Sequence, residues 1–288
     1  MMPFHRICAF AFFIMVWVSC SQPVDRWERA RQELNRQDFL GCIIELNLLM
    51  DGQMPSDSAL LMRAYCYNRV GKHDKAEADL LHVLRINPGN LGARLEYGRL
   101  MAYRGDTLGA LKMLTIPGDK AEKQILSDFL LERARLLFFT RRFSESLINL
   151  NQAIEADSTN AEAWFLRGGF YSSTLVYPQA QFFKPAQAIL DFQKAIQHKP
   201  DYAEAYFKLA NTEMDNFGEM YSGMIHLSKA IQLDPYLSDY YVERAKRHIS
   251  LGSTSAAVKD LQTALHLNPL DTASRAVLRE LGIKKEAP

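Results

Sequence analysis

The sequence has no surplus of either charge. It contains 34 lysines and arginines against 33 aspartates and glutamates, which gives a formal net charge of +1. Nucleic acids and anionic membranes attract chains that carry a large positive surplus. Since this chain has none, we expect no nucleic-acid partner.

Catalytic and metal-binding motifs are also missing. The chain contains no HExxH, GxSxG or GxGxxG, so the signals of zinc proteases, nucleophile-elbow hydrolases and dinucleotide-binding enzymes are absent. It has no CxxC or CxxH spacing that would hold a metal. The histidines are scattered along the chain. We therefore expect no enzyme activity, no cofactor and no metal.

Cysteine is scarce, and two of the four cysteines lie in the first 20 residues. Arg6 precedes an apolar run, Ile7 to Val18, which is typical of an export signal and is shorter than the ~20 residues of a membrane span. The ending Val18-Ser19-Cys20 resembles a bacterial lipoprotein signal, in which the cysteine is lipidated after cleavage. The resemblance implies a lipid on Cys20 that anchors the chain to a membrane. Ordinary secretion and an uncleaved anchor remain as alternatives.

The expected location follows from this signal. A lipidated chain with Ser21 after the cysteine is expected in the cell envelope, as an outer-membrane lipoprotein that faces the periplasm. In an oxidising compartment Cys42 and Cys66 could form a disulfide. Burial of both as small core residues is the favoured interpretation, and the disulfide stays open.

The rest of the chain repeats. Three helical segments end in the same way, at Pro200, Pro235 and Pro269, which are 35 and 34 residues apart. Each proline follows an Ala-Ile or Ala-Leu pair at similar spacing, and Pro88 closes an earlier segment in the same manner. A fixed period of this length indicates stacked helical repeats.

The best-defined repeat contains Trp164, Gly168, Tyr171, Ala188 and Pro200. At these spacings it resembles the tetratricopeptide repeat, and the resemblance covers nearly all of the chain after the signal. It implies an all-α, right-handed solenoid of about seven helix pairs with a C-terminal capping helix. The expected parts are a signal over 1–20, a solenoid over 21–271 with pairs near 23–56, 57–90, 91–126, 127–160, 161–202, 203–237 and 238–271, and a capping helix and tail over 272–288.

Small residues allow the two helices of a pair to cross closely. Ala64 is expected to face Ala76, and Gly168 to face Ala188, with large residues three and four positions away filling the remaining space. Three glycines are expected where the first helix of a pair ends and a positive φ is needed. These are Gly71, Gly105 and Gly252.

The resemblance implies that the first helices line a concave groove, and that the groove binds a peptide or helix segment of another protein. Arginine and aromatic residues, which protein interfaces favour, recur at the expected groove positions. The candidate groove residues are Trp27, Leu61, Tyr65, Leu95, Arg99, Tyr103, Leu131, Arg135, Phe138, Phe139, Phe165, Phe207 and Asn211. An acidic row along the other rim contains Asp128, Glu162, Glu204 and Asp239. A solvated groove in which Arg135 and Asp128 offset each other is the alternative.

Extra residues separate the two helices of the fifth pair, and they include Tyr177, Phe182 and Phe183. A loop on a rigid scaffold often carries function, although Phe182 and Phe183 could instead pack onto the solenoid. The predicted function is a non-catalytic adaptor of the cell envelope that binds a partner protein. The alternative is an envelope solute- or glycan-binding protein that uses the aromatic residues of the groove and of this loop.

Overall fold

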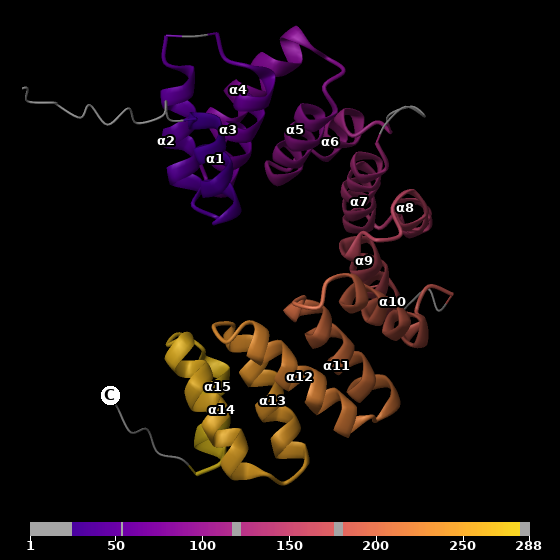
Figure 1. The fold of residues 1–288 in the computed structure, drawn as a ribbon. Coiled ribbons are helices and arrows are strands. Elements are labelled where there is room, and N and C mark those ends of the chain that lie inside the picture. Colours follow the sequence, from indigo (N-terminus) through magenta and orange to yellow (C-terminus); the bar gives the residue numbers. More distant parts are fainter. Residues whose placement is uncertain (1–24, 53, 117–121, 176–180, 283–288) are drawn as a thin grey trace, which may run out of the picture. The chain divides into compact units, whose positions relative to one another are not determined.

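The computed structural model describes residues 25–52, 54–116, 122–175 and 181–282. These residues form fifteen helices and no strand (Figure 1). The chain divides into two compact parts, with the boundary between Val83 and Leu84. We call them the N-terminal body and the C-terminal body. None of the described helices is both long and apolar enough to cross a membrane.

The N-terminal body is built from the first two helix pairs. Its helices are α1 (Arg26–Asn35), α2 (Phe39–Met50), α3 (Asp57–Arg69) and most of α4 (His73–Ile86). Asp25 and Ser56 cap α1 and α3 by accepting hydrogen bonds from backbone N–H groups of the first turn.

Cys42 on α2 and Cys66 on α3 are both fully buried. They are free thiols in hydrogen-bond contact, so the structure shows the favoured core role. Contact with Cys42 and burial together raise the pKa of the Cys66 thiol.

The C-terminal body continues the same plan with five further pairs and a last single helix. Its helices are α5 (Leu91–Tyr103), α6 (Thr107–Met113), α7 (Lys123–Phe139), α8 (Phe143–Ala156), α9 (Ala161–Ser172), α10 (Pro185–His198), α11 (Ala203–Phe217), α12 (Met220–Leu233), α13 (Ser238–Ser250), α14 (Thr254–Leu267) and α15 (Thr272–Glu280). From α7 on, each helix packs on the next one along the chain, and α15 covers α14 (Figure 1). The predicted all-α solenoid of helix pairs with a capping helix is confirmed.

Small residues lie at the helix crossings as predicted. Ala64 and Ala76 are fully buried. A Cβ added at Gly168 would lie 2.7 Å from the Phe192 ring and 3.2 Å from the carbonyl oxygen of Ala188. Any larger residue at this crossing would therefore push α9 away from α10.

The turns within the pairs depend on a left-handed residue. Gly71, Gly105 and Gly252 have φ of 73°, 86° and 73°, as predicted. Gln37 and Arg141 adopt the same conformation in the first and fourth pairs, with φ of 61° and 60°. Side chains with a Cβ are strained there, so these two turns keep the shared geometry at a conformational cost.

Two pairs depart from the regular length. The second helix of the third pair, α6, has only seven residues. In the fifth pair, α9 ends at Ser172 and α10 begins at Pro185. Phe182 packs against Phe143 and Phe170, with ring centroids 6.4 and 5.7 Å away. Phe182 and Phe183 both lie against the core of this region, and Tyr177 lies outside the described residues.

Candidate protein-interaction surface

Five residues occupy one equivalent position on the first helices of the C-terminal body, and we call them the groove row. It contains the predicted groove residues Arg99, Arg135 and Asn211 on α5, α7 and α11, together with Gly169 on α9 and Lys246 on α13. The acidic row contains Asp128, Glu162, Glu204 and Asp239, and each lies about two turns before the groove-row residue of its helix, on α7, α9, α11 and α13. Helical periodicity places both rows on the same side of these helices.

The cations of the groove row are already paired. Arg99 donates from Nε to Glu132 at 2.9 Å and from Nη1 to Glu96 at 2.6 Å. Burial opposes its charge, but the two carboxylates outweigh that effect and raise the pKa of the guanidinium. Lys246 binds Glu243 at 3.1 Å.

Arg135 forms its ion pair with Glu162. The alternative pairing of Arg135 with Asp128 is therefore wrong. Asp128 instead accepts a hydrogen bond from Gln124 at 3.3 Å. Burial raises the pKa of the Asp128 carboxyl, and the nearby Arg99 charge and the Gln124 hydrogen bond only partly offset that effect.

The remaining two members of the acidic row, Glu204 and Asp239, are exposed. Neither Glu204 nor Asp239 has a lysine or arginine within ion-pair distance among the described residues. The acidic row thus offers carboxylates that the chain itself leaves without a cation.

Several predicted groove residues are core residues instead. Leu95, Leu131 and Phe165 are 4%, 2% and 9% exposed, because the next helix of the stack covers them. Phe138 packs against Phe143 and Phe170, with ring centroids 5.4 and 5.7 Å away. Leu95, Leu131 and Phe165 are thus covered, and the half-buried Phe138 ring is engaged in packing between helices.

Other predicted residues are accessible. Phe139 is 90% exposed at the end of α7, and Tyr103 is 72% exposed at the end of α5. In the N-terminal body, Trp27, Leu61 and Tyr65 are half-buried. Cys20 lies outside the described residues.

Two tyrosines that sequence reasoning missed lie beside the acidic row. Tyr202 packs on Phe165, and Tyr240 packs on Phe207, each with ring centroids 4.8 Å apart. Burial, together with Glu204, Asp234 and Asp239, raises the pKa of Tyr240 to about 12. The available signal was a tyrosine near the start of a first helix, one repeat after a groove phenylalanine.

Two buried polar atoms have no hydrogen-bond partner in the described part of the chain: Oδ1 of Asn211 and Nε of Arg247. Arg247 lies against α11, because its Nη2 binds Asp215 at 2.8 Å while also binding Glu243 at 2.5 Å. An unused acceptor on α11 and an unused donor on α13 thus belong to neighbouring pairs.

A second set of arginines forms well-defined bridges that the sequence did not predict. We call Arg63, Arg167 and Arg244 the bridging arginines. Each binds an aspartate on the second helix of its own pair with two N–H groups, at 2.7 to 2.9 Å. Each also donates from Nη1 to a residue 16 positions earlier, on the second helix of the preceding pair. One guanidinium therefore fastens consecutive pairs together.

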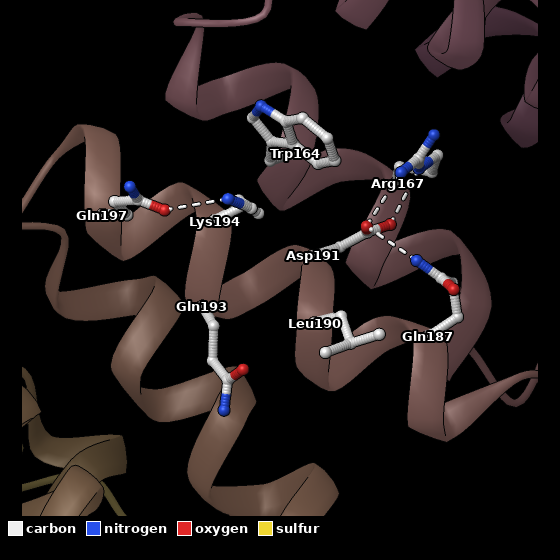
Figure 2. A pocket seen from close by; sticks show the side chains of 8 residues that line it. All are labelled: Trp164, Arg167, Gln187, Leu190, Asp191, Gln193, Lys194 and Gln197. Atoms are coloured by element: carbon white, nitrogen blue, oxygen red, sulfur yellow. Dashed lines mark hydrogen bonds and ion pairs between the residues drawn. The ribbon is translucent and has the colours of Figure 1, made fainter.

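Arg167 and Asp191 line a hollow of about 510 Å³ on α9 and α10 (Figure 2). Most of its polar groups bind one another: Arg167 and Gln187 donate to Asp191, and Lys194 donates to Gln197. The guanidinium of Arg167 also lies 5.0 Å from the Trp164 ring centroid. Since the guanidinium of Arg167 and the carboxylate of Asp191 are paired with each other, we interpret this part of the hollow as a structural contact between helices. The described residues contain no cluster of potential metal ligands.

Comparison with known proteins agrees with this architecture. The tetratricopeptide repeat family model matches residues 57–90, which span the second helix pair. The structure resembles that of Pseudomonas aeruginosa pilF, with a TM-score of 0.62 at 16% identity over 78% of this chain and 97% of that one. The fold is a tetratricopeptide repeat solenoid.

Two further relatives share the repeat. A tetratricopeptide repeat protein from Parabacteroides merdae superposes with a TM-score of 0.54 at 14% identity, over 88% of this chain and 96% of that one. A tetratricopeptide repeat and J domain-containing co-chaperone, DNJ1 of Fusarium oxysporum f. sp. lycopersici, is 25% identical over 258 residues. That match covers 87% of this chain and 47% of the co-chaperone, so the chain spans about half the length of this curated relative.

Proposed function

We propose that this tetratricopeptide repeat protein is a non-catalytic scaffold that binds a segment of a partner protein along the first helices of its C-terminal body. The repeat itself is a protein-interaction scaffold. The observation that carries the proposal is the pair of unused buried atoms, Oδ1 of Asn211 and Nε of Arg247. They are an acceptor and a donor, and a peptide group offers the matching N–H and C=O.

The energetic argument is one of unmet hydrogen bonds. More than nine in ten buried polar groups in proteins have a partner, and leaving one unpaired costs about 1–3 kcal/mol. A bound segment that supplies both partners would recover this cost. Surface aromatic residues would add contact area, and Phe139 is the most exposed of those on the first helices.

An in-cell photo-crosslink tests this proposal. A photoreactive amino acid at Phe139 or at Lys246, both exposed, should give a discrete adduct with one protein. Tyr221 on α12 is 84% exposed and serves as the matched position on a second helix. The same adduct from all three positions, or none from Phe139 and Lys246, would contradict the proposal.

We further propose that the chain is exported and held at the outer membrane through a lipid on Cys20, so that it acts as an adaptor facing the periplasm. This rests on the apolar run and the Val18-Ser19-Cys20 ending. Cells grown with a labelled fatty acid should transfer the label to the chain. The Cys20→Ser variant should carry no label, and label that persists in this variant would refute lipidation at this cysteine.

A further inference from the structure

Along the first helices of the fourth to seventh pairs, the cations of the groove row have partners within the described part of the chain, whereas some of the carboxylates do not. Arg135 and Lys246 of the groove row both have carboxylate partners within the chain. Glu204 and Asp239 of the acidic row have no lysine or arginine within ion-pair distance among the described residues. An incoming chain therefore finds unused negative charge here, although the whole protein is nearly neutral.

Tyr240 adds an independent observation. Its side chain is only 2% exposed, its ring lies on Phe207, and its hydroxyl has no hydrogen-bond partner among the described residues. Glu204 and Asp239 lie close enough to this hydroxyl to disfavour its ionisation. The Tyr240 hydroxyl thus lies within electrostatic reach of Glu204 and Asp239 and hydrogen-bonds neither of them.

The side chain of Asn211 on α11 also presents an unused hydrogen-bond acceptor, as the carboxylates do. Oδ1 of Asn211 is buried and can only accept a hydrogen bond. An ammonium group brings three donors and no acceptor, and a guanidinium brings five. A carboxylate brings acceptors alone and would be repelled by Glu204 and Asp239.

We propose that the acidic row, with Tyr240 and Asn211 beside it, binds a lysine- or arginine-bearing segment of the partner protein. One basic side chain lies between Glu204 and Asp239 and contacts the Tyr240 hydroxyl, while the adjoining peptide N–H donates to Asn211. The inference rests on the proposed function, because it specifies the chemistry of the segment that the scaffold binds.

Two synthetic peptides test the charge preference directly. They share the same apolar residues and carry lysine in one and glutamate in the other at every third position. Fluorescence anisotropy with the full chain at low ionic strength should show the lysine peptide binding about tenfold or more tightly, and added salt should reduce the difference. Equal binding of both peptides, or binding of neither, overturns the inference.

Charge-matched variants locate the site. Glu204→Gln with Asp239→Asn should weaken binding of the lysine peptide by about tenfold. The control, Glu155→Gln with Glu219→Gln, makes the same change in net charge at exposed residues of α8 and at the start of α12 and should leave binding unchanged. Equal losses in both pairs of variants would mean a diffuse charge effect and would overturn the inference. Far-ultraviolet circular dichroism verifies that each variant is folded.

The crosslink at Phe139 separates the two proposals. If the protein adduct persists in the Glu204→Gln, Asp239→Asn variant and the lysine peptide is not preferred, the scaffold function stands and the basic segment is refuted. If no adduct forms but the lysine peptide binds and is lost in the variant, the charge preference stands and the scaffold function fails.

Discussion

Arginine occupies two positions of the first helices, and the two sets differ in what surrounds their partners. The aspartates bound by the bridging arginines have side chains only 1–9% exposed. In the groove row, the side chains of Arg99 and Arg135 are 35% and 43% exposed, and the partner of Arg135 is 47% exposed. The two positions are two residues apart, which turns them by about 200° on the helix. Burial of the partner acid, rather than the arginine itself, separates a structural bridge from a surface charge.

Breaking a bridge should give the largest effect. Arg167→Ala leaves Asp191, which is 1% exposed, with Gln187 as its remaining partner, so we expect a loss of about 3 kcal/mol or more in the free energy of unfolding. Urea denaturation measures this loss. The double variant Arg167→Leu, Asp191→Leu removes both charges and should recover much of it. A loss below about 1 kcal/mol in the single variant would show that the bridge is not structurally important.

The adjacent residues Phe138 and Phe139 should also differ in how much they contribute to stability. Phe138→Ala removes a ring that packs on Phe143 and Phe170, and we expect a loss of about 2–4 kcal/mol. Phe139→Ala changes a side chain that is 90% exposed, and its effect on stability should stay within about 0.5 kcal/mol. Thermal denaturation compares them. Similar losses in the two variants would show that Phe139 is also part of the core.

Removing a groove arginine should affect binding more than stability. Arg135→Gln breaks an exposed ion pair, which contributes at most about 1 kcal/mol, and it frees Glu162. The acidic row then gains an available carboxylate, so the lysine peptide should bind several-fold more tightly. Anisotropy with wild-type protein as the reference measures the change, and weaker binding would indicate that Arg135 itself contacts the peptide.

Sequence reasoning reached the helix pairs because their signals are local. Gly71 and Gly252 mark turns, and the alanines at the crossings recur at a fixed spacing. The bridges were not predicted because Arg167 and Asp191 are 24 residues apart, and only the packing of α9 on α10 brings them together. Leu131 and Phe165 were misassigned for a related reason. A helical register defines which side a residue faces, but the neighbouring helix decides whether that side is covered.

Asp128, the half-buried member of the acidic row, should give the smallest effect of this series. Burial raises the pKa of Asp128 in the folded chain, so the unfolded chain loses this proton at lower pH. As pH rises through the unfolded and then the folded pKa, ionisation of Asp128 therefore costs stability. Asp128→Asn should stabilise the protein slightly at pH 7, by less than about 1 kcal/mol because solvent screens a partly exposed carboxyl. The gain should disappear below the unfolded pKa, where both carboxyls are protonated. Thermal denaturation at neutral and acidic pH measures both quantities, and a variant that is less stable at neutral pH would mean that its bond to Gln124 outweighs the burial cost.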